Sequence, residues 1–310
     1  MGLYIGLDLG GTNLKYALGD ETGKLSTKKS MPSLSNENQD KIFENIFSAI
    51  EELLDETDSD IPAIGMGTPG SVNFERGQLN GTTPNIPDWT NAPIKKSIED
   101  KFGIPTYVDN DANVVALAEA RCGAAADCSS VVCFTIGTGI GGGIILDNKI
   151  LRGASYSAAE VGHITVEMNG KPCGCGNFGC LEAYAAAPAM IKRYRHKLKR
   201  TGLLYKEDQL SPEFIFQKAA VEEDFAIETI NETCDYLGTG IASIVNVLNP
   251  EMVLIGGGVS EAGEEFIQRI EKVVRQKIMK ACSDVLKVGK VQLGNDAGVV
   301  GAILLAAEGK

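Results

Sequence analysis

Residues 8–12 read DLGGT, and they follow the short apolar run LYIGL at residues 3–7. A second apolar run, NLKYALGD at residues 13–20, comes directly after the two glycines. Two such runs joined by a glycine turn are typical of a β-hairpin, and LSTKKSM at residues 25–31 adds a third strand. Because glycine has no side chain, a ligand can approach the backbone of this turn closely.

The same pattern returns in the second half of the chain. Residues 130–150, SVVCFTIGTGIGGGIILDNKI, predict a strand, a longer glycine turn and a returning strand. Between the two hairpins, apolar residues at helical spacing in residues 39–56 predict an amphipathic helix. Two halves that each open with the same unit indicate a duplicated α/β fold of two domains flanking a cleft.

Hydrophobic periodicity, together with glycine and proline at element ends, places the remaining elements. We expect strands at residues 61–67, 104–111, 252–257 and 290–294 (KVQLG), and helices at residues 92–103, 112–123, 212–247, 264–278 and 297–308. The predicted domains are a small α/β domain, residues 1–112 with the C-terminal helix 297–310, and a larger α/β domain, residues 113–296.

The chain has 310 residues and a formal net charge of -12 at pH 7. This charge repels nucleic acid and anionic membrane surfaces at long range, so we expect neither as a partner. The N-terminal residues lack the basic segment and the cleavage site of a signal peptide, and no stretch reaches the roughly 18–20 apolar residues of a membrane span. We therefore expect a cytoplasmic protein.

The glycine turns pose the question of what they bind. GTGIGG at residues 137–142 matches the G-x-G-x-x-G pattern of dinucleotide-binding folds, but a strand rather than a helix follows it, so we reject that interpretation. One such hairpin alone is more often a tight turn that binds nothing. Two of them, each with a threonine beside glycine, favour phosphate, because backbone N–H groups and a hydroxyl can bind its oxygens. Asp8 then becomes a candidate for holding Mg²⁺ through water.

In the segment VDNDANVV, residues 108–115, Asn110 and Asp111 lie where a predicted strand ends and a predicted helix begins. One interpretation is that either side chain simply caps the helix. The other is that the carboxylate takes the proton of an alcohol as its oxygen attacks phosphorus. The spacing of the residues does not separate the two.

Three of the eight cysteines, Cys173, Cys175 and Cys180, lie within eight residues, and His163 precedes them. The other five are scattered and are interpreted as reduced thiols. One imidazole and three thiolates are a normal ligand set for a closed tetrahedral zinc site, against the alternative of chance clustering. We expect a structural zinc ion that orders the glycine-rich loop 160–182.

An ordered loop would also place two carboxylates, because Glu160 stands just before the histidine and Glu182 just after the last cysteine. Carboxylates are the acceptors that bind hydroxyl-rich ligands. The second histidine, His196, lies in the basic run KRYRHKLKR at residues 192–200, which we interpret as a solvated helix face or a dimer contact.

Taken together, the motifs DLGGTNLK, GMGTPG, NDAN, TIGTGIGGG, EVGH, CGCGNFGC and IGGGVS occur in the order seen in the ROK family of sugar kinases. The resemblance covers nearly the whole chain. It implies the duplicated actin-like fold of the ribonuclease H-like ATPases, a hexose and ATP as ligands, Mg²⁺ with ATP, and a homodimer. Glucokinases of the family commonly show GEIGH where this chain has AEVGH, residues 159–163.

The resemblance also implies roles for individual residues. Asp111 resembles the catalytic base, and His163 would offer one ring nitrogen to zinc and the other to a sugar hydroxyl. The implied sugar-binding residues are Gly70, Thr83, Asn110, Asp111, Glu160, His163 and Glu182. The implied ATP-binding residues are Asp8, Gly10, Gly11, Thr12, Lys15, Thr138 and Gly139 near the phosphates, and Gly257 and Gly258 near the adenosine.

The leading hypothesis is an ATP-dependent hexokinase that phosphorylates glucose at its 6-hydroxyl. An N-acylmannosamine kinase, or a kinase of another hexose, is the alternative in the same family, since Ser71 and Thr83 are small residues expected near the substituent at carbon 2. A non-catalytic sugar sensor is a further alternative. Regulators of this family carry a helix-turn-helix before the first hairpin, whereas Asp8 is only seven residues from the first residue here. A zinc-dependent interaction module would need neither Asp111 nor the second glycine turn.

Overall fold

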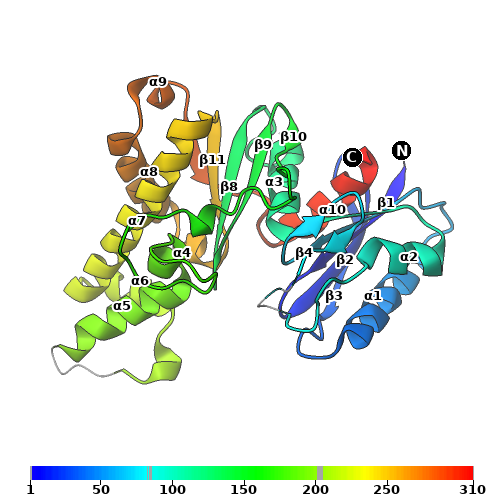
Figure 1. The fold of residues 1–310 in the computed structure, drawn as a ribbon, viewed down its shortest axis with the longest axis horizontal. Coiled ribbons are helices and arrows are strands. Elements are labelled where there is room, and N and C mark those ends of the chain that lie inside the picture. The colour runs from blue at the N-terminus through cyan, green and yellow to red at the C-terminus, as the bar shows by residue number, and fades with distance from the viewer. Residues whose placement is uncertain (1, 82, 84–85, 201–204, 310) are drawn as a thin grey trace. The chain divides into compact units, whose positions relative to one another are not determined.

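The computed structural model describes residues 2–81, 83, 86–200 and 205–309 of the chain (Figure 1). The strands are β1 Leu3–Leu9, β2 Asn13–Asp20, β3 Leu25–Pro32, β4 Ile64–Thr68, β5 Val72–Asn73, β6 Gln78–Leu79, β7 Thr106–Asn110, β8 Val131–Ile136, β9 Ile140–Leu146, β10 Lys149–Ile150, β11 Met252–Gly256 and β12 Lys287–Lys290. The helices are α1 Gln39–Leu54, α2 Ile94–Phe102, α3 Asp111–Cys122, α4 Glu182–Ala185, α5 Ala187–Lys199, α6 Pro212–Ala220, α7 Asp224–Leu248, α8 Glu264–Lys277, α9 Lys280–Ser283 and α10 Ala297–Glu308.

Two five-stranded sheets have the same topology. Their strand orders are β3-β2-β1-β4-β7 and β10-β9-β8-β11-β12. When the five strands of each sheet are numbered along the chain, both orders become third, second, first, fourth and fifth. In the first sheet β1 pairs antiparallel with β2 and parallel with β4, and in the second β8 and β12 pair parallel with β11. The duplicated α/β arrangement predicted from the two glycine hairpins is confirmed.

One predicted strand is wrong. KVQLG at residues 290–294 was expected to be extended, but β12 ends at Lys290, where its pairing with β11 also ends. The N–H groups of Gln292 and Leu293 instead donate to Oε1 of Glu119, each at 2.8 Å. Glu119 is fully buried, and its carboxylate takes the donors that a sheet ladder would need.

The chain forms two compact units. One consists of Met1–Ser129, Gly143–Ala159 and Gln292–Lys310, and the other of Ser130–Gly142 and Glu160–Val291. The domains expected from the sequence, residues 1–112 with 297–310 and residues 113–296, stay a prediction. Among the described residues, no helix combines the length and the apolar character that crossing a bilayer requires.

In the first unit, successive residues of β1 point to opposite faces of the sheet, and the two faces meet different neighbours. Ile5, Leu7 and Leu9 are fully buried in a core shared with α1 and α2. The intervening residues Gly6 and Asp8 face α10, the helix drawn in red in Figure 1. Asp8 therefore reaches the opposite side of the sheet from the main apolar core.

Glycines let α10 approach its neighbours at backbone distance. A Cβ atom on Gly65 of β4 would lie 1.8 Å from the carbonyl oxygen of Ala302, and one on Gly6 would lie 2.6 Å from that of Val299. On α10 itself, a Cβ on Gly301 would lie 1.9 Å from the carbonyl oxygen of Val114 in α3. No real side chain fits at these distances, so the contact between α10, the sheet and α3 depends on glycine.

The substitution Gly65→Ala tests this contact. The added methyl group must push α10 off β4, because the atom that it meets is backbone and cannot turn aside. We expect the free energy of unfolding to fall by about 3 kcal/mol, measured by chemical denaturation. Gly174→Ala is the control, since a Cβ there points into open space. Equal stability of Gly65→Ala and the parent would show that the close packing is not required.

Candidate active site and metal centre

Asp111 stands at the first position of α3, directly after β7. Asn110 is the N-cap, and its Oδ1 accepts from the N–H groups of Ala112 at 2.9 Å and Asn113 at 3.3 Å. The capping role that the sequence left open therefore falls mainly on Asn110, although Asp111 Oδ1 also accepts from Ala112 at 2.9 Å.

Asp111 lies in the electric field of a second carboxylate. Burial, and then the charge of Asp8, raise the pKa of Asp111 from 3.8 to about 6, against hydrogen bonds to Ala112 and Asn110 that lower it. Burial also raises the pKa of Asp8, which the nearby Lys15 partly offsets. Asp111 is thus poised to take up and release a proton close to neutral pH.

Asp8 and Lys15 are cross-strand partners in the β1–β2 hairpin. Lys15 Nζ lies 3.6 Å from Asp8 Oδ2 and donates to the carbonyl oxygen of Asn295 at 2.7 Å. The space beside Asp8 is kept by Gly298 of α10, where a Cβ would lie 2.3 Å from the same carboxylate oxygen. The hairpin and α10 together therefore fix the Asp8 side chain.

The turn of this hairpin, Gly10 to Thr12, is partly or fully exposed. Two of its carbonyl groups are occupied, since Gly11 O accepts from the Ser35 hydroxyl and Thr12 O accepts from Ser33 N at 2.9 Å. Within the described part of the chain, no acceptor pairs with the N–H groups of Gly11 and Thr12. These two residues thus present backbone donors, which suits an anion.

Two residues expected near the sugar lie next to Asn110. Asn110 Nδ2 donates to the carbonyl oxygen of Gly70 at 3.0 Å. Gly70 has φ of 97°, and a Cβ on it would lie 3.3 Å from Cβ of Thr83. The first unit therefore brings together Gly70, Thr83, Asn110 and Asp111 as a group.

An ion pair that no sequence motif indicates supports this group. Asp109 is 2% exposed, and its Oδ2 lies 2.8 Å from Nε of Arg152. Its Oδ1 accepts from the Asn110 N–H and from the Asn113 side chain, each at 2.8 Å. The Arg152 guanidinium lies 3.6 Å from the centre of the Phe74 ring. Only the acidic residue within the apolar strand could have drawn attention to Asp109.

In the second unit, Glu182 is tied to the second glycine turn. Its Oε2 accepts from Ile140 N at 2.9 Å, and a Cβ on Gly139 would lie 2.5 Å from the same oxygen. Thr138 is exposed at the tip of that turn. Glu182 Oε1 lies 3.8 Å from Cys173 Sγ, so one carboxylate contacts both the turn and the cysteine loop.

The predicted adenosine contacts follow β11. Gly257 has φ of 84°, in the left-handed region that favours glycine, and a Cβ on it would lie 2.4 Å from the carbonyl oxygen of Ile136. Ile136 is the last residue of β8, directly before the turn that carries Thr138. A Cβ on Gly258 meets only open space. These glycines therefore lie beside the second turn.

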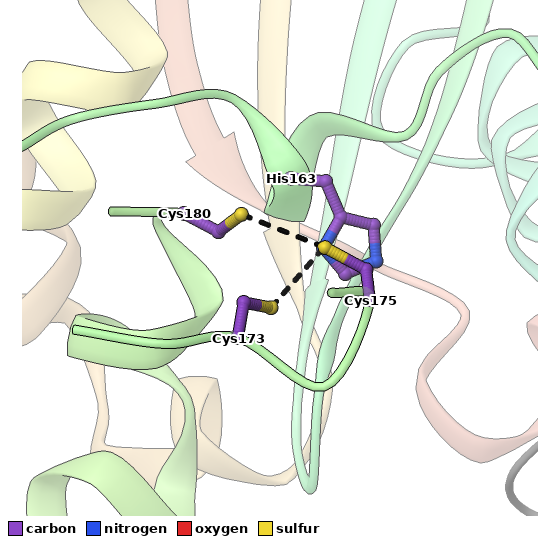
Figure 2. A group of neighbouring side chains, drawn as sticks. All are labelled: His163, Cys173, Cys175 and Cys180. Atoms are coloured by element: carbon purple, nitrogen blue, oxygen red, sulfur yellow. Dashed lines mark hydrogen bonds between the residues drawn. The ribbon is translucent and has the colours of Figure 1, made fainter. Parts of the chain in front are cut away.

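His163, Cys173, Cys175 and Cys180 form a cluster whose ligand atoms all lie within 4.8 Å of one another. Figure 2 shows the four side chains gathered together. His163 Nδ1 is 3.6 Å from Cys173 Sγ, and Cys175 Sγ is 3.7 Å from Cys180 Sγ. Burial, and then hydrogen bonds to the other two thiols, raise the pKa of Cys180 to about 12. Three sulfurs and one imidazole nitrogen facing a common centre fit a tetrahedral zinc ion.

The two nitrogens of His163 face different partners. Nδ1 points to the cysteines, whereas Nε2 lies 4.0 Å from Oε2 of Glu160. The 3-10 turn Val161–His163 brings the two side chains together, because His163 N donates to Glu160 O at 3.0 Å. One ring can therefore serve the metal cluster and a second ligand beside Glu160.

Comparison with known proteins gives the same picture over the whole chain. Residues 4–309 match the ROK family. A glucokinase of Halalkalibacterium halodurans is 35% identical over 96% of this chain and 93% of its own length. The solved ROK family glucokinase of Streptomyces griseus, in complex with glucose and AMPPNP, is 34% identical with a TM-score of 0.84, covering 99% of this chain and 100% of that one. The xylose repressor of Caldicellulosiruptor bescii is 33% identical over 98% of this chain and 78% of the repressor.

The fold class expected from the sequence, a duplicated α/β fold of the actin-like type, is thereby confirmed. The identities extend over nearly full lengths, so the family likeness does not rest on the glycine motifs alone. Both an enzyme and a repressor stand among these relatives. The roles of the individual site residues stay predictions.

Substituting Asn for Asp111 should make the ligand-free protein more stable at about pH 8. The folded-state pKa lies above the ordinary value of 3.8, so the stability due to this group is full below about pH 4 and is lost as the pH rises through about 6. Removing the charge should raise the free energy of unfolding by on the order of 2 kcal/mol at about pH 8. Denaturation of both proteins at about pH 4 and 8 checks this, and a variant less stable at both values would contradict it.

Cys175→Ser should lower the bound zinc from about one ion per chain to well below half, because one of four ligands is lost. Elemental analysis of the purified protein measures this. Cys122→Ser is the matched control, since Cys122 lies outside the cluster and donates to the carbonyl oxygen of Ala118, which serine can also do. Equal zinc in parent and Cys175→Ser would exclude the cluster as the zinc site.

Proposed function

The chain belongs to the ROK family, and from that premise we propose that it is an ATP-dependent sugar kinase that phosphorylates glucose at the 6-hydroxyl. The observation that carries the proposal is the carboxylate of Asp111, which stands at the start of α3 and whose pKa is raised to about 6 by burial and by the charge of Asp8. The relatives named glucokinase support the choice of sugar.

In the proposed reaction, deprotonated Asp111 accepts the proton of the 6-hydroxyl as that oxygen attacks the γ-phosphorus of ATP. The bond between the γ-phosphorus and the bridging oxygen breaks, and ADP leaves with the electron pair. A carboxylate with a raised pKa is a stronger base than a solvated one, yet it remains largely ionised at neutral pH. Mg²⁺ bound with ATP would offset charge on the phosphates, and Asp8 would hold it through water.

We assign sugar binding to residues from both units. Asn110, Gly70 and Thr83 surround Asp111 in the first, and Glu160, His163 and Glu182 lie near the metal cluster in the second. The carboxylates would accept hydrogen bonds from sugar hydroxyls, and His163 Nε2 would bind another.

We assign the phosphates of ATP to the donors of the two glycine turns. Gly11 and Thr12 offer free N–H groups, and Thr138 offers an exposed hydroxyl. The remaining proposed contacts are Gly10, Lys15 and Gly139 for the phosphates and Gly257 and Gly258 for the adenosine. Because Lys15 bonds to Asn295 O and Asp8, its use by ATP would require a change of partner.

We further propose that the cysteine–histidine cluster holds a structural zinc ion. With four protein ligands such an ion has no open position for substrate, so its contribution is to order loop 160–182 and to fix Glu160, His163 and Glu182. We also propose a cytoplasmic location, as expected from the sequence, and a homodimer, as the family resemblance implies.

Two alternatives remain. A kinase of N-acylmannosamine or another hexose would use the same base and hydroxyl ligands, and the small residues Ser71 and Thr83 leave space for a larger substituent. A sugar-sensing protein without activity is suggested by the likeness to xylose repressors. Such a sensor would need to bind sugar but would have no use for a base with a raised pKa.

The test is a coupled assay of ADP formation with glucose, mannose, fructose, N-acetylglucosamine and N-acetylmannosamine. We expect glucose to give the largest kcat/KM, and Asp111→Asn to lower kcat by at least about a hundredfold, since a general base contributes about that much or more. Zinc content and the circular dichroism spectrum of the variant should equal those of the parent.

The outcomes separate the alternatives. A preference for N-acetylmannosamine would replace the proposed substrate but keep the mechanism. If no sugar stimulates ADP formation while glucose still binds in calorimetry, the protein is a sensor rather than a kinase. An Asp111→Asn variant as active as the parent would remove Asp111 from the mechanism.

A further inference from the structure

The segment between Arg152 and Glu160 is fastened to the group around Asn110 at two points. At its start, Arg152 Nε is 2.8 Å from Asp109 Oδ2, one residue before Asn110. Further along, the hydroxyl of Ser157 is 2.6 Å from the hydroxyl of Ser71, and Ser71 Oγ also donates to the carbonyl oxygen of Tyr156 at 3.3 Å.

These two points are themselves joined through Asn110. Its backbone N–H donates to Asp109 Oδ1 at 2.8 Å, and its side chain donates to Gly70 O at 3.0 Å, one residue before Ser71. The contacts therefore close a ring that runs from Arg152 through Asp109, Asn110, Gly70 and Ser71 to Ser157. All members of this ring belong to the first unit.

The segment needs such fastening because its backbone is strained. Tyr156 has φ of 61° and Ala159 has φ of 64°, both in the left-handed region that side chains disfavour. In this region the Cβ atom of a non-glycine residue crowds the following carbonyl oxygen, so the conformation is less stable than an ordinary one. Ala159 directly precedes Glu160, so the backbone angle at Ala159 decides the direction in which Glu160 leaves the segment.

We propose that the hydrogen bond between Ser71 and Ser157 is a positioning contact that holds Tyr156 and Ala159 in their left-handed conformation and thereby sets the direction in which the chain continues into Glu160. The role in sugar binding rests on the proposed function, in which Glu160 accepts a hydroxyl of the hexose. The same ring passes through Asn110, so the carboxylate that binds sugar and the residue beside the base share one support. Loss of either serine hydroxyl should let the segment relax toward ordinary backbone angles.

The structure provides matched variants. Ser157→Ala and Ser71→Ala each remove one hydroxyl of the pair, and Ser157→Thr keeps it. Ser155→Ala is the control, because only the backbone oxygen of Ser155 takes part in a hydrogen bond with Ser157. Ala159→Gly removes the cost of the left-handed angle without touching the pair.

Two readouts test the proposal, and the first does not depend on activity. Amide hydrogen exchange of residues 156–160 should be faster in Ser157→Ala and Ser71→Ala than in the parent, and unchanged in Ser155→Ala and Ser157→Thr. In the kinase assay, the KM for sugar should rise about fivefold in the two alanine variants, as expected for one lost hydrogen bond. The KM for ATP should stay the same, and Ala159→Gly should restore part of the sugar KM in the Ser157→Ala background.

Unchanged exchange in both Ser157→Ala and Ser71→Ala would overturn the proposal whatever the protein's activity. Faster exchange with an unchanged sugar KM would overturn the link to Glu160. If the parent phosphorylates no sugar, the proposed function fails, and the exchange experiment still decides whether the serine pair holds the segment.

Discussion

The close contact of α10 with β1, β4 and α3 is the constraint on which the rest of the first unit depends. It is made by backbone meeting backbone at Gly6, Gly65 and Gly301, so it fixes distances more tightly than interlocking side chains would. Gly298 of the same helix leaves the space that Asp8 occupies. Because α3 begins at Asp111, the contact also sets how closely the two carboxylates approach.

The proximity of two partly buried carboxylates lowers the stability of the fold and raises the pKa of Asp111. A protein selected for stability alone would pair Asp111 with a cation, but the cation here, Lys15, lies beside Asp8. Of the two carboxylates, Asp111 is therefore the one whose pKa, raised to about 6, lies close to neutral pH. The ion pair between the buried Asp109 and Arg152 holds the backbone next to Asn110. It adds no net charge to the site, because the two opposite charges balance each other.

The parts that the sequence predicted are those whose signals are local. The hairpins follow from glycines between alternating strands, α10 from an unbroken apolar run, and the metal cluster from three cysteines within eight residues. The strand predicted at residues 290–294 was wrong because the N–H groups of Gln292 and Leu293 donate to Glu119, which lies 173 and 174 residues away along the chain. Likewise, the sequence around Arg152 does not indicate its ion pair with Asp109. No sequence pattern indicates that Ala159 adopts a backbone angle suited to glycine. Long-range pairing and backbone strain leave no periodic trace in a sequence.

The central claim is that the Asp111 carboxylate meets the reacting hydroxyl of the hexose. A crystal structure with glucose and a non-hydrolysable ATP analogue measures this most directly. We predict a distance of about 2.6–3.2 Å between an Asp111 oxygen and the 6-hydroxyl, with Glu160 and His163 on other hydroxyls of the same sugar. A bound glucose that contacts Glu160 and His163 while its 6-hydroxyl lies beyond reach of Asp111 would contradict the account.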